Sequence, residues 1–161
     1  GSDIGMPLWN VLMEAGRDLD VRAGCPNGIE RVEGGLLSYG NDMTRENTPH
    51  EAGLGRFCNT ATAIGCIGRD ALLRVVKDGP VKQVRAIEIE ADRLPRCDRA
   101  WPLTDRGKRV GQVSSAAISP DFGCGVAIGM VRMTHWDAGT EVMVETQDGA
   151  LPARVHENFW I

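Results

Sequence analysis

The sequence predicts an α+β protein in which short helices are followed by a small antiparallel β-barrel or sandwich. Three observations support this prediction. In the first half, apolar residues recur every three to four positions, as in amphipathic helices. After Val81 they alternate with polar residues, as in half-buried strands. The 20 glycines and 8 prolines provide the tight turns that short strands need.

Two segments before residue 45 carry the signals of short helices. The first begins after Ser2 or Asp3, which are candidate caps. The second is predicted from Pro26 to Val32 and runs into Gly34 and Gly35, where glycine permits backbone angles that other residues resist. The apolar stripe of the first helix consists of Leu8, Val11, Leu12 and Ala15.

Two further helices are predicted before the strands begin. Thr48 and Glu51 match a capping box, and a proline between them occupies the first helical position. We therefore expect a short helix that ends near Gly53 or Gly55. Residues 68–77 contain good helix formers and precede an Asp-Gly-Pro stop, so they should form a connecting helix.

Polar and apolar residues alternate through most of the chain after Val81. In the first such segment, Val84, Ala86 and Glu88 should share one face of a strand, and the residues between them should share the other. An Asp-Gly pair at 148–149 predicts a two-residue hairpin turn. Five or six strands are expected, at residues 84–89, Lys108–Ala116, Val126–Met133, Thr140–Thr146 and Ala150–His156.

Charge and hydropathy argue against two classes of partner. The formal net charge is −4, the pI is near 5.4 and the 18 Lys and Arg residues are scattered, whereas nucleic-acid binding needs clustered cations. No apolar run approaches the about 20 residues of a transmembrane helix, and the first residues lack the regions of a signal peptide. We expect a cytoplasmic protein that binds neither nucleic acid nor membranes.

The cysteines and histidines show no metal-binding or disulfide pattern. There is no Cys-x-x-Cys pair and no His-Glu-x-x-His helix, and the five cysteines leave at least one unpaired. We expect the cysteines to be reduced and mostly buried, because a free cysteine behaves as a small apolar side chain. No metal ligand is assigned.

Glu30 and Glu33, in the predicted second helix, are three residues apart and therefore share a face. Such a pair suits general acid and base catalysis. Acids that are solvated, or paired with Arg22 or Arg31, are the simpler interpretation. This spacing therefore assigns no catalytic residue.

Two phrases of the sequence carry a family resemblance. The first, from Pro26 to Met43, contains Pro-Asn-Gly-Ile-Glu-Arg-Val-Glu-Gly-Gly followed by Leu-Ser-Tyr-Gly. The second runs from Arg109 to Pro120 and continues at Val126–Val131. The first phrase resembles the folate-site elbow of the aminomethyltransferase (glycine cleavage T-protein) family, closest to its dimethylsulfoniopropionate demethylase-like branch. We call residues 26–43 the elbow; the similarity extends over nearly the whole chain.

The resemblance implies the C-terminal part of a folate-binding aminomethyltransferase fold. Residues 1–59 would end the folate-binding domain, residues 60–80 would form a connecting helical segment, and residues 81–161 would form a Greek-key β-barrel. The cofactor would be tetrahydrofolate. The parent enzyme would move a one-carbon unit to N5 of tetrahydrofolate from a small methylated sulfonium, amine or methoxy compound. An N-terminal domain outside this chain, or self-association, would complete it.

The resemblance also implies two cofactor-binding residues. Tyr39 is the single tyrosine, and the corresponding tyrosine of the resembling families lies close to the pterin. Asn27 stands where the glycine-cleavage branch has a folate-binding arginine, and the loss of that charge-assisted contact favours the demethylase-like branch. The acidic residue that such enzymes place near N5 would precede Gly1. We therefore assign no catalytic residue, and expect this chain alone to be inactive and to bind folate weakly.

Three alternatives remain open. The parent enzyme could be a glycine-cleavage-type aminomethyltransferase. The chain could instead be a non-catalytic module for folate binding or assembly. A generic barrel that binds an oligonucleotide or a sugar is the third alternative, although acidity and the lack of interleaved aromatic and basic residues argue against it.

Overall fold

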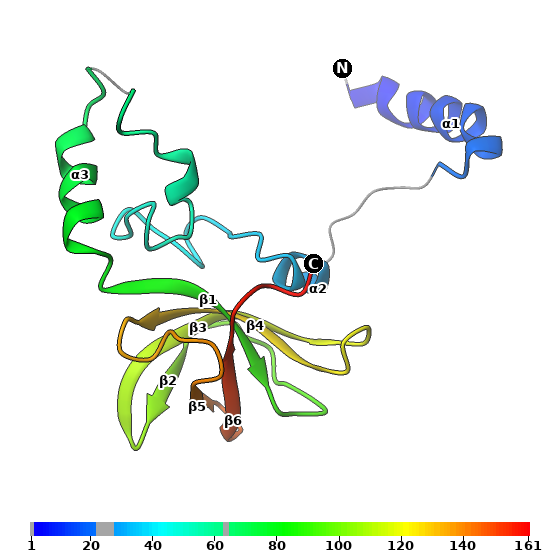
Figure 1. Ribbon diagram of the computed structural model, residues 1–161. Helices are drawn as coiled ribbons and strands as arrows, with labels where there is room; N and C mark the ends of the chain where they lie inside the picture. The colour runs from blue at the N-terminus through cyan, green and yellow to red at the C-terminus, as the bar shows by residue number, and fades with distance from the viewer. Residues whose placement is uncertain (1, 22–27, 63–64) are drawn as a thin grey trace.

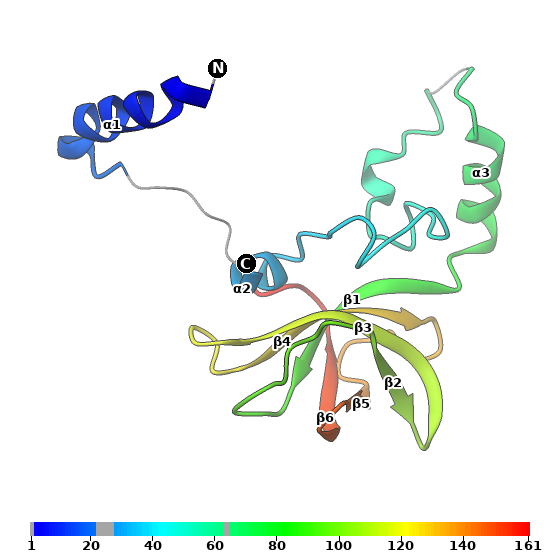
Figure 2. The same ribbon diagram turned by 180° about the vertical axis from the view of Figure 1, so that it is seen from behind.

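The computed structural model describes residues 2–21, 28–62 and 65–161. Within these ranges, helical segments come first and a closed barrel of six strands follows (Figures 1 and 2). The helices are α1 (Gly5–Ala15), α2 (Gly28–Glu33) and α3 (Arg69–Asp78), with 3-10 turns at Ser2–Ile4, Arg17–Leu19 and Gly55–Phe57. The strands are β1 (Lys82–Ile89), β2 (Trp101–Asp105), β3 (Lys108–Ser119), β4 (Cys124–Arg132), β5 (Glu141–Thr146) and β6 (Gly149–His156).

The barrel has a Greek-key topology. Its strands follow the order β1-β4-β3-β2-β5-β6, and β6 closes the barrel by pairing with β1. All six pairings are antiparallel. Strands β2, β3 and β4 are consecutive, and β1 returns beside β4, which is the Greek-key connection. The predicted α+β fold with an antiparallel barrel is confirmed, and the sandwich alternative is wrong.

Apolar side chains from every strand fill the barrel interior. Trp101 is 1% exposed, and its indole N–H donates a hydrogen bond of 2.9 Å to the side-chain oxygen of Gln147. Burying a side chain of this size contributes about 1.5–3 kcal/mol. The interior cluster comprises Ile87, Ile89, Trp101, Leu103, Val110, Val113, Ala127, Val131, Val142, Val144, Ala153 and Val155.

A second apolar cluster lies on the outer face of the barrel, where α2 packs against β3 and β4. Val32 of α2 is 2% exposed. Figures 1 and 2 show α2 and the C-terminus together over this face. Strand β1 therefore has two buried faces, because Ile87 points into the barrel while Val84 belongs to the outer cluster, as the alternation predicted. The outer cluster comprises Val32, Val84, Val126, Ile128 and Met130, with Leu37, Ala117, Cys124, Phe159 and Trp160 packed against it.

Several local predictions need correction. The residue that precedes α1, Ile4, makes no side-chain cap. The predicted capping box does form, since the Thr48 N–H donates to Glu51 Oε2 at 2.9 Å and the Glu51 N–H donates to Thr48 Oγ1 at 3.2 Å. Residues 49–53 nevertheless form turns and not an α-helix, so the helix predicted to end near Gly53 or Gly55 is wrong, and only a 3-10 turn follows at Gly55–Phe57. The turn of the last hairpin consists of Gln147 and Asp148, one position earlier than predicted.

The two longest helices contribute little to the core. Helix α1 has 11 residues and α3 has 10, and neither contains a buried residue. Helix α3 ends at Asp78, and the next residue, Gly79, has a positive φ of 77°, which suits glycine. No helix in the described part of the chain is long and apolar enough to cross a membrane.

Candidate functional site: the elbow on the barrel

The loop that follows α2 makes a tight bend on the outer face of the barrel. The Gly40 N–H donates to the Met43 carbonyl at 2.8 Å, and the Asp42 N–H donates to the Ser38 carbonyl at 2.9 Å. Gly40 has a positive φ of 92°, which a residue with a Cβ rarely adopts. An isolated bridge pairs Tyr39 with Met43. The bend turns the Asp42 carboxylate towards the barrel and leaves Tyr39 at the surface, 66% exposed.

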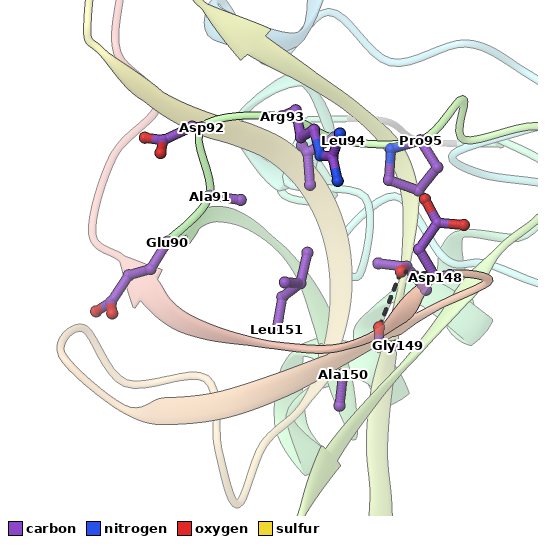
Figure 3. A pocket seen from close by; sticks show the side chains of 11 residues that line it. Glu90, Ala91, Asp92, Arg93, Leu94, Pro95, Asp148, Gly149, Ala150 and Leu151 are labelled. Atoms are coloured by element: carbon purple, nitrogen blue, oxygen red, sulfur yellow. Dashed lines mark hydrogen bonds between the residues drawn. The ribbon is translucent and has the colours of Figure 1, made fainter.

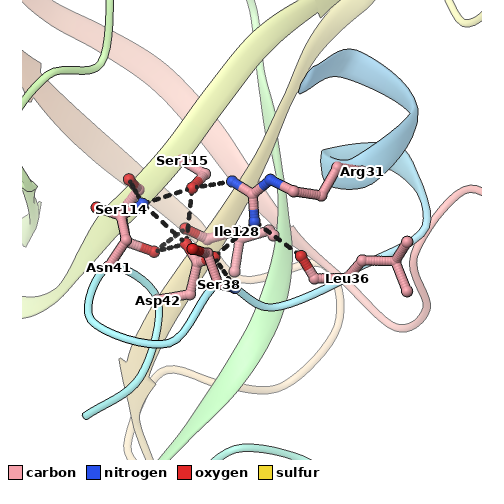
Figure 4. Close-up of polar contacts among 8 residues, drawn as sticks. All are labelled: Arg31, Leu36, Ser38, Asn41, Asp42, Ser114, Ser115 and Ile128. Atoms are coloured by element: carbon pink, nitrogen blue, oxygen red, sulfur yellow. Dashed lines mark hydrogen bonds and ion pairs between the residues drawn. The ribbon is translucent and has the colours of Figure 1, made fainter. Parts of the chain in front are cut away.

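The carboxylate of Asp42 lies at the centre of a polar network that joins the elbow to β3 (Figure 4). The side chain of Asp42 is fully buried. Its Oδ1 accepts hydrogen bonds from the hydroxyls of Ser114 at 2.6 Å and Ser115 at 2.7 Å. Its Oδ2 accepts from Arg31 Nη1 and from the Ser38 N–H, both at 2.7 Å. Each oxygen thus has two short hydrogen bonds, which is what a buried carboxylate needs.

Neighbouring groups complete this network. Arg31 Nη1 also donates to the Leu36 carbonyl at 2.7 Å, and Nη2 donates to Ser115 Oγ. Asn41 Nδ2 lies 2.9 Å from both the Ser114 carbonyl and Ser115 Oγ. The Ser115 hydroxyl therefore accepts from Arg31 and Asn41 while it donates its single proton to Asp42. This assignment gives both oxygens of Asp42 and the hydroxyls of Ser114 and Ser115 partners of the correct kind.

The network keeps Asp42 ionised. Burial alone raises the pKa of Asp42, because it disfavours the charged form. The hydrogen bonds from Ser114, Ser115, the Ser38 N–H and Arg31 outweigh that effect, so the pKa lies below its ordinary value. The elbow and the barrel are thus held together by a charged group that is fully compensated.

The C-terminal segment packs against the elbow at the end of α2. The Trp160 N–H donates to the Glu33 carbonyl at 2.9 Å. Gly35 has a positive φ of 62°, and a Cβ atom there would lie 2.4 Å from Cδ2 of Phe159. Glycine at this position therefore allows both the bend and the close packing of the phenyl ring. The Trp160 ring stacks on His156, with centroids 5.4 Å apart.

The sequence named only part of this site. Tyr39 lies in the bend, whereas Asn27 lies outside the described residues. Glu33 was expected to be solvated or paired, but it is only 3% exposed and its Oε1 has no hydrogen-bond partner in the structure. Arg31 was expected to pair with a neighbouring glutamate; it pairs with Asp42 instead. Asp42, Ser114 and Ser115 were missed, because residues more than 70 positions apart give no periodic signal of their contact.

Hollows in the described surface differ in how close they lie to the elbow. A groove of about 280 Å³ lies directly beside the bend, between Met43 and the outer face of the barrel. A larger hollow of about 680 Å³ lies between the segment that follows β1 and the β5–β6 hairpin (Figure 3). In Figures 1 and 2 that hairpin lies on the side of the barrel away from α2. The groove adjoins the elbow at Asp42 and Met43, and a further hollow of about 550 Å³ adjoins it along α2 and Leu36.

The described cysteines do not form a metal site. Cys66 is exposed, and Cys58, Cys97 and Cys124 are half-buried, so the expectation of mostly buried cysteines is wrong. All four are free thiols, and Cys25 lies outside the described residues. Among the residues that the structure describes, no group of three or more His, Cys, Asp or Glu side chains could hold a metal ion.

Comparison with known families matches both parts of this structure. The family model of the GCVT N-terminal domain matches residues 2–62, and that of the glycine cleavage T-protein C-terminal barrel domain matches residues 82–160. The chain belongs to the glycine cleavage T-protein (aminomethyltransferase) family. The family resemblance of the elbow and barrel phrases is thereby confirmed.

Relatives within this family differ in their similarity to the chain. Dimethylsulfoniopropionate demethylase DmdA of Ruegeria pomeroyi is 59% identical over 160 residues, which are 99% of this chain and 43% of that protein. An aminomethyltransferase of Symbiobacterium thermophilum is 35% identical over 93% of this chain and 40% of its own length. The crystal structure of aminomethyltransferase T from Bartonella henselae superposes with a TM-score of 0.72 at 29% identity, over 81% of this chain and 37% of its own. The chain thus spans less than half the length of these relatives of the T-protein family.

Proposed function

We propose that this T-protein family chain forms one wall of the tetrahydrofolate site of an enzyme that moves a one-carbon unit to N5 of tetrahydrofolate. The 59% identity to a demethylase supports a methyl-transferring parent enzyme whose donor is a small methylated compound. Residues 1–59, 60–80 and 81–161 would serve as the end of the folate-binding domain, the connecting segment and the barrel. The cytoplasmic location expected from the sequence stays a prediction.

One observation carries this proposal. The bend presents Tyr39 to solvent while the Asp42 network fixes the backbone below it. An exposed aromatic ring on a rigid support offers an apolar face for stacking and a hydroxyl for a hydrogen bond, which suits a flat heterocycle with polar edges. We assign Tyr39 to the pterin. Asn27 is proposed as a second contact on the basis of its place in the elbow phrase.

Catalysis of methyl transfer depends mainly on how the protein positions the reacting atoms. Transfer of a methyl group requires the N5 lone pair to lie in line with the methyl carbon, and correct orientation alone can lower a barrier by about 7–11 kcal/mol. A support that holds Tyr39 within narrow limits contributes to that orientation. The buried network and the Phe159 ring against Gly35 provide such a support.

Binding measurements on Tyr39 variants test the proposal. In the protein that contains this chain, Tyr39→Phe should weaken tetrahydrofolate binding by about two-fold to ten-fold, the value of one hydrogen bond, and Tyr39→Ala should weaken it further. Phe57→Ala is the matched control, because Phe57 is also exposed, at 69%, but lies outside the elbow. Equal affinity for wild type and Tyr39→Ala, measured by calorimetry, would remove Tyr39 from the site.

Glycine-cleavage-type aminomethyl transfer is the second candidate, supported by the 35% identical aminomethyltransferase. Both activities would use the same cofactor wall. They differ in the donor, so product analysis of the parent enzyme with methylated sulfonium, amine and methoxy compounds distinguishes them. A non-catalytic folate-binding module would bind tetrahydrofolate and turn over none of these donors.

A further inference from the structure

A hollow of about 510 Å³ lies where β1 begins, and it shares none of its lining residues with the groove beside the elbow. The turns that follow the Thr48 capping box contribute His50 and Arg56 to this hollow. The start of β1 contributes Gln83, and the β4–β5 connection contributes Trp136. Three segments that are distant in the sequence therefore meet here.

Hydrogen bonds hold the first of these segments against β1. The Val84 N–H donates to the Glu51 carbonyl at 2.7 Å, and Gln83 Nε2 donates to the His50 carbonyl at 3.3 Å. The Glu51 carboxylate accepts from the Thr48 N–H in the capping box. This wall of the hollow is thus ordered before any ligand arrives, which lowers the entropic cost of binding.

Trp136 forms a second fixed wall. Its carbonyl accepts a hydrogen bond from Arg85 Nε at 2.9 Å, and the Arg85 guanidinium lies 5.3 Å from the centroid of its ring. The ring also packs against the interior cluster of the barrel. Arg85 interacts electrostatically with Asp137, the residue after Trp136. The charge of Arg85 therefore already has a counter-charge.

Arg56 brings a positive charge to the hollow that no acid compensates. Its side chain is exposed and forms neither an ion pair nor a hydrogen bond with a described residue. The guanidinium lies 4.7 Å from the centroid of the Phe57 ring, which carries no charge. Among the described residues that line the hollow, none is acidic. The hollow is therefore cationic in a chain whose formal net charge is −4.

His50 adds a nitrogen atom without a partner. Its Nε2 is buried and forms no hydrogen bond within the described part of the chain. At the other ring nitrogen, a Cβ atom on residue 55 would lie 2.6 Å from Nδ1, so Gly55 allows the imidazole to lie against the backbone. A buried polar atom without a partner is unfavourable, and a ligand atom that accepts a hydrogen bond from Nε2 would remove this cost.

We propose that this hollow is an oxyanion site that binds the carboxylate or phosphate group of a small ligand. The guanidinium of Arg56 offers two parallel N–H donors, which match two oxygens of either group. His50 offers a further donor, and Trp136 supplies an apolar wall beside the charged group. The site uses neither Tyr39 nor the Asp42 network, so it stands independently of the folate site proposed above.

Titration of this chain with inorganic phosphate, followed by NMR at constant ionic strength, tests the proposal. Saturable shifts should concentrate at the amides of Gly53 and Gly55 and at the indole N–H of Trp136. Arg56→Gln should weaken this binding by about ten-fold, because charge-assisted hydrogen bonds are lost. Its melting temperature should stay unchanged, since the Arg56 side chain has no partner to lose. Arg74→Gln, which changes an exposed arginine of α3, is the matched control and should bind as wild type does.

His50→Phe separates the imidazole nitrogen from the bulk of the ring. It should weaken phosphate binding by about three-fold to ten-fold, the value of one hydrogen bond. If this variant is less stable than wild type, the proposal is decided by Arg56→Gln, which leaves the packing intact.

A parallel titration with sodium acetate identifies the group that the site prefers. Saturation of the same signals by acetate at lower concentration than by phosphate assigns the site to carboxylates, and the reverse order assigns it to phosphates. Equal shifts on addition of sodium chloride would overturn the proposal, because they would show only general screening of a charged surface. Unchanged phosphate affinity in Arg56→Gln, or no saturable shift with either oxyanion at tens of millimolar, would overturn it as well.

Discussion

Replacement of Asp42 by asparagine tests whether the buried network holds the elbow on the barrel. The substitution keeps the shape of the side chain but removes its charge. An asparagine retains one acceptor oxygen, and its NH2 group meets donors where Oδ2 or Oδ1 had accepted hydrogen bonds. With the NH2 group at the place of Oδ2, the Ser38 N–H loses its acceptor and Arg31 loses its ion pair. With the NH2 group at the place of Oδ1, the Ser115 hydroxyl loses its acceptor, while the Ser114 hydroxyl keeps only the Ile128 carbonyl at 3.3 Å.

The size of the effect follows from burial. Removing one partner of a buried ion pair costs about 3–5 kcal/mol. Two features lower this figure here: the Arg31 side chain is 27% exposed, so water solvates part of its charge, and asparagine keeps one acceptor. We therefore expect Asp42→Asn to weaken the docking of the elbow on the barrel by about 2–3 kcal/mol.

Native-state hydrogen exchange measures this quantity locally. The Leu36 N–H, which donates to the Arg31 carbonyl, and the Ser38 N–H report on the elbow. Their exchange should accelerate by about 30-fold to 150-fold in Asp42→Asn, while amides inside the barrel strands keep their protection. Asp92→Asn, an exposed aspartate replaced in the same way, is the control. Equal protection of the elbow amides in wild type and Asp42→Asn would refute the clamp role of the network.

A double-mutant cycle with Arg31→Met isolates the pair. If Arg31 and Asp42 act together, the sum of the stability losses of the two single variants should exceed the stability loss of the double variant.

The dependence of stability on acidic pH gives an independent check. Because the folded-state pKa of Asp42 is lowered, its stabilisation is complete above the unfolded value of about 3.9 and is lost as the pH falls through the lower folded pKa. Asp42→Asn should flatten this part of the stability profile.

Two further predictions concern the elbow and the barrel rim. Gly35→Ala should destabilise the protein by more than about 1 kcal/mol, because φ is positive and Phe159 blocks a Cβ; Gly34→Ala, its milder neighbour, is the control, and equal urea midpoints would contradict the argument. Burial, followed by the charges of nearby acids, raises the pKa of Cys97 to about 11. Iodoacetamide at pH 8 should therefore modify exposed Cys66 well before Cys97, as read by mass spectrometry; the reverse order would be a refutation.

The strands show where sequence patterns are informative. The alternation at Val84 and Ile87 predicted two faces of β1, and both faces are buried against different layers. Strand β2 (Trp101–Asp105) was not predicted individually, because it is only five residues long and contains Pro102, a residue that usually interrupts strands. The Thr48 capping box was read correctly as a local hydrogen-bond pattern, yet it does not determine whether a helix follows.

The candidate site contains contacts that sequence patterns do not predict. The glycine bend and Tyr39 are local features, and their phrase carries the resemblance to the family. The partners of Asp42 are not local, since Ser114 and Ser115 come from a strand more than 70 residues away. Their contact depends on the closure of the barrel and on the docking of α2, which no periodicity describes.

Titration of this chain with tetrahydrofolate, followed residue by residue by NMR, tests the central claim most directly. We expect weak binding with shifts concentrated at Tyr39, Met43 and Gln112, since the elbow and the barrel surface beside it would contact one ligand. Shifts confined to the hollow near Leu151, or no shifts at millimolar tetrahydrofolate, would contradict the claim that the elbow and barrel together form a folate-binding wall.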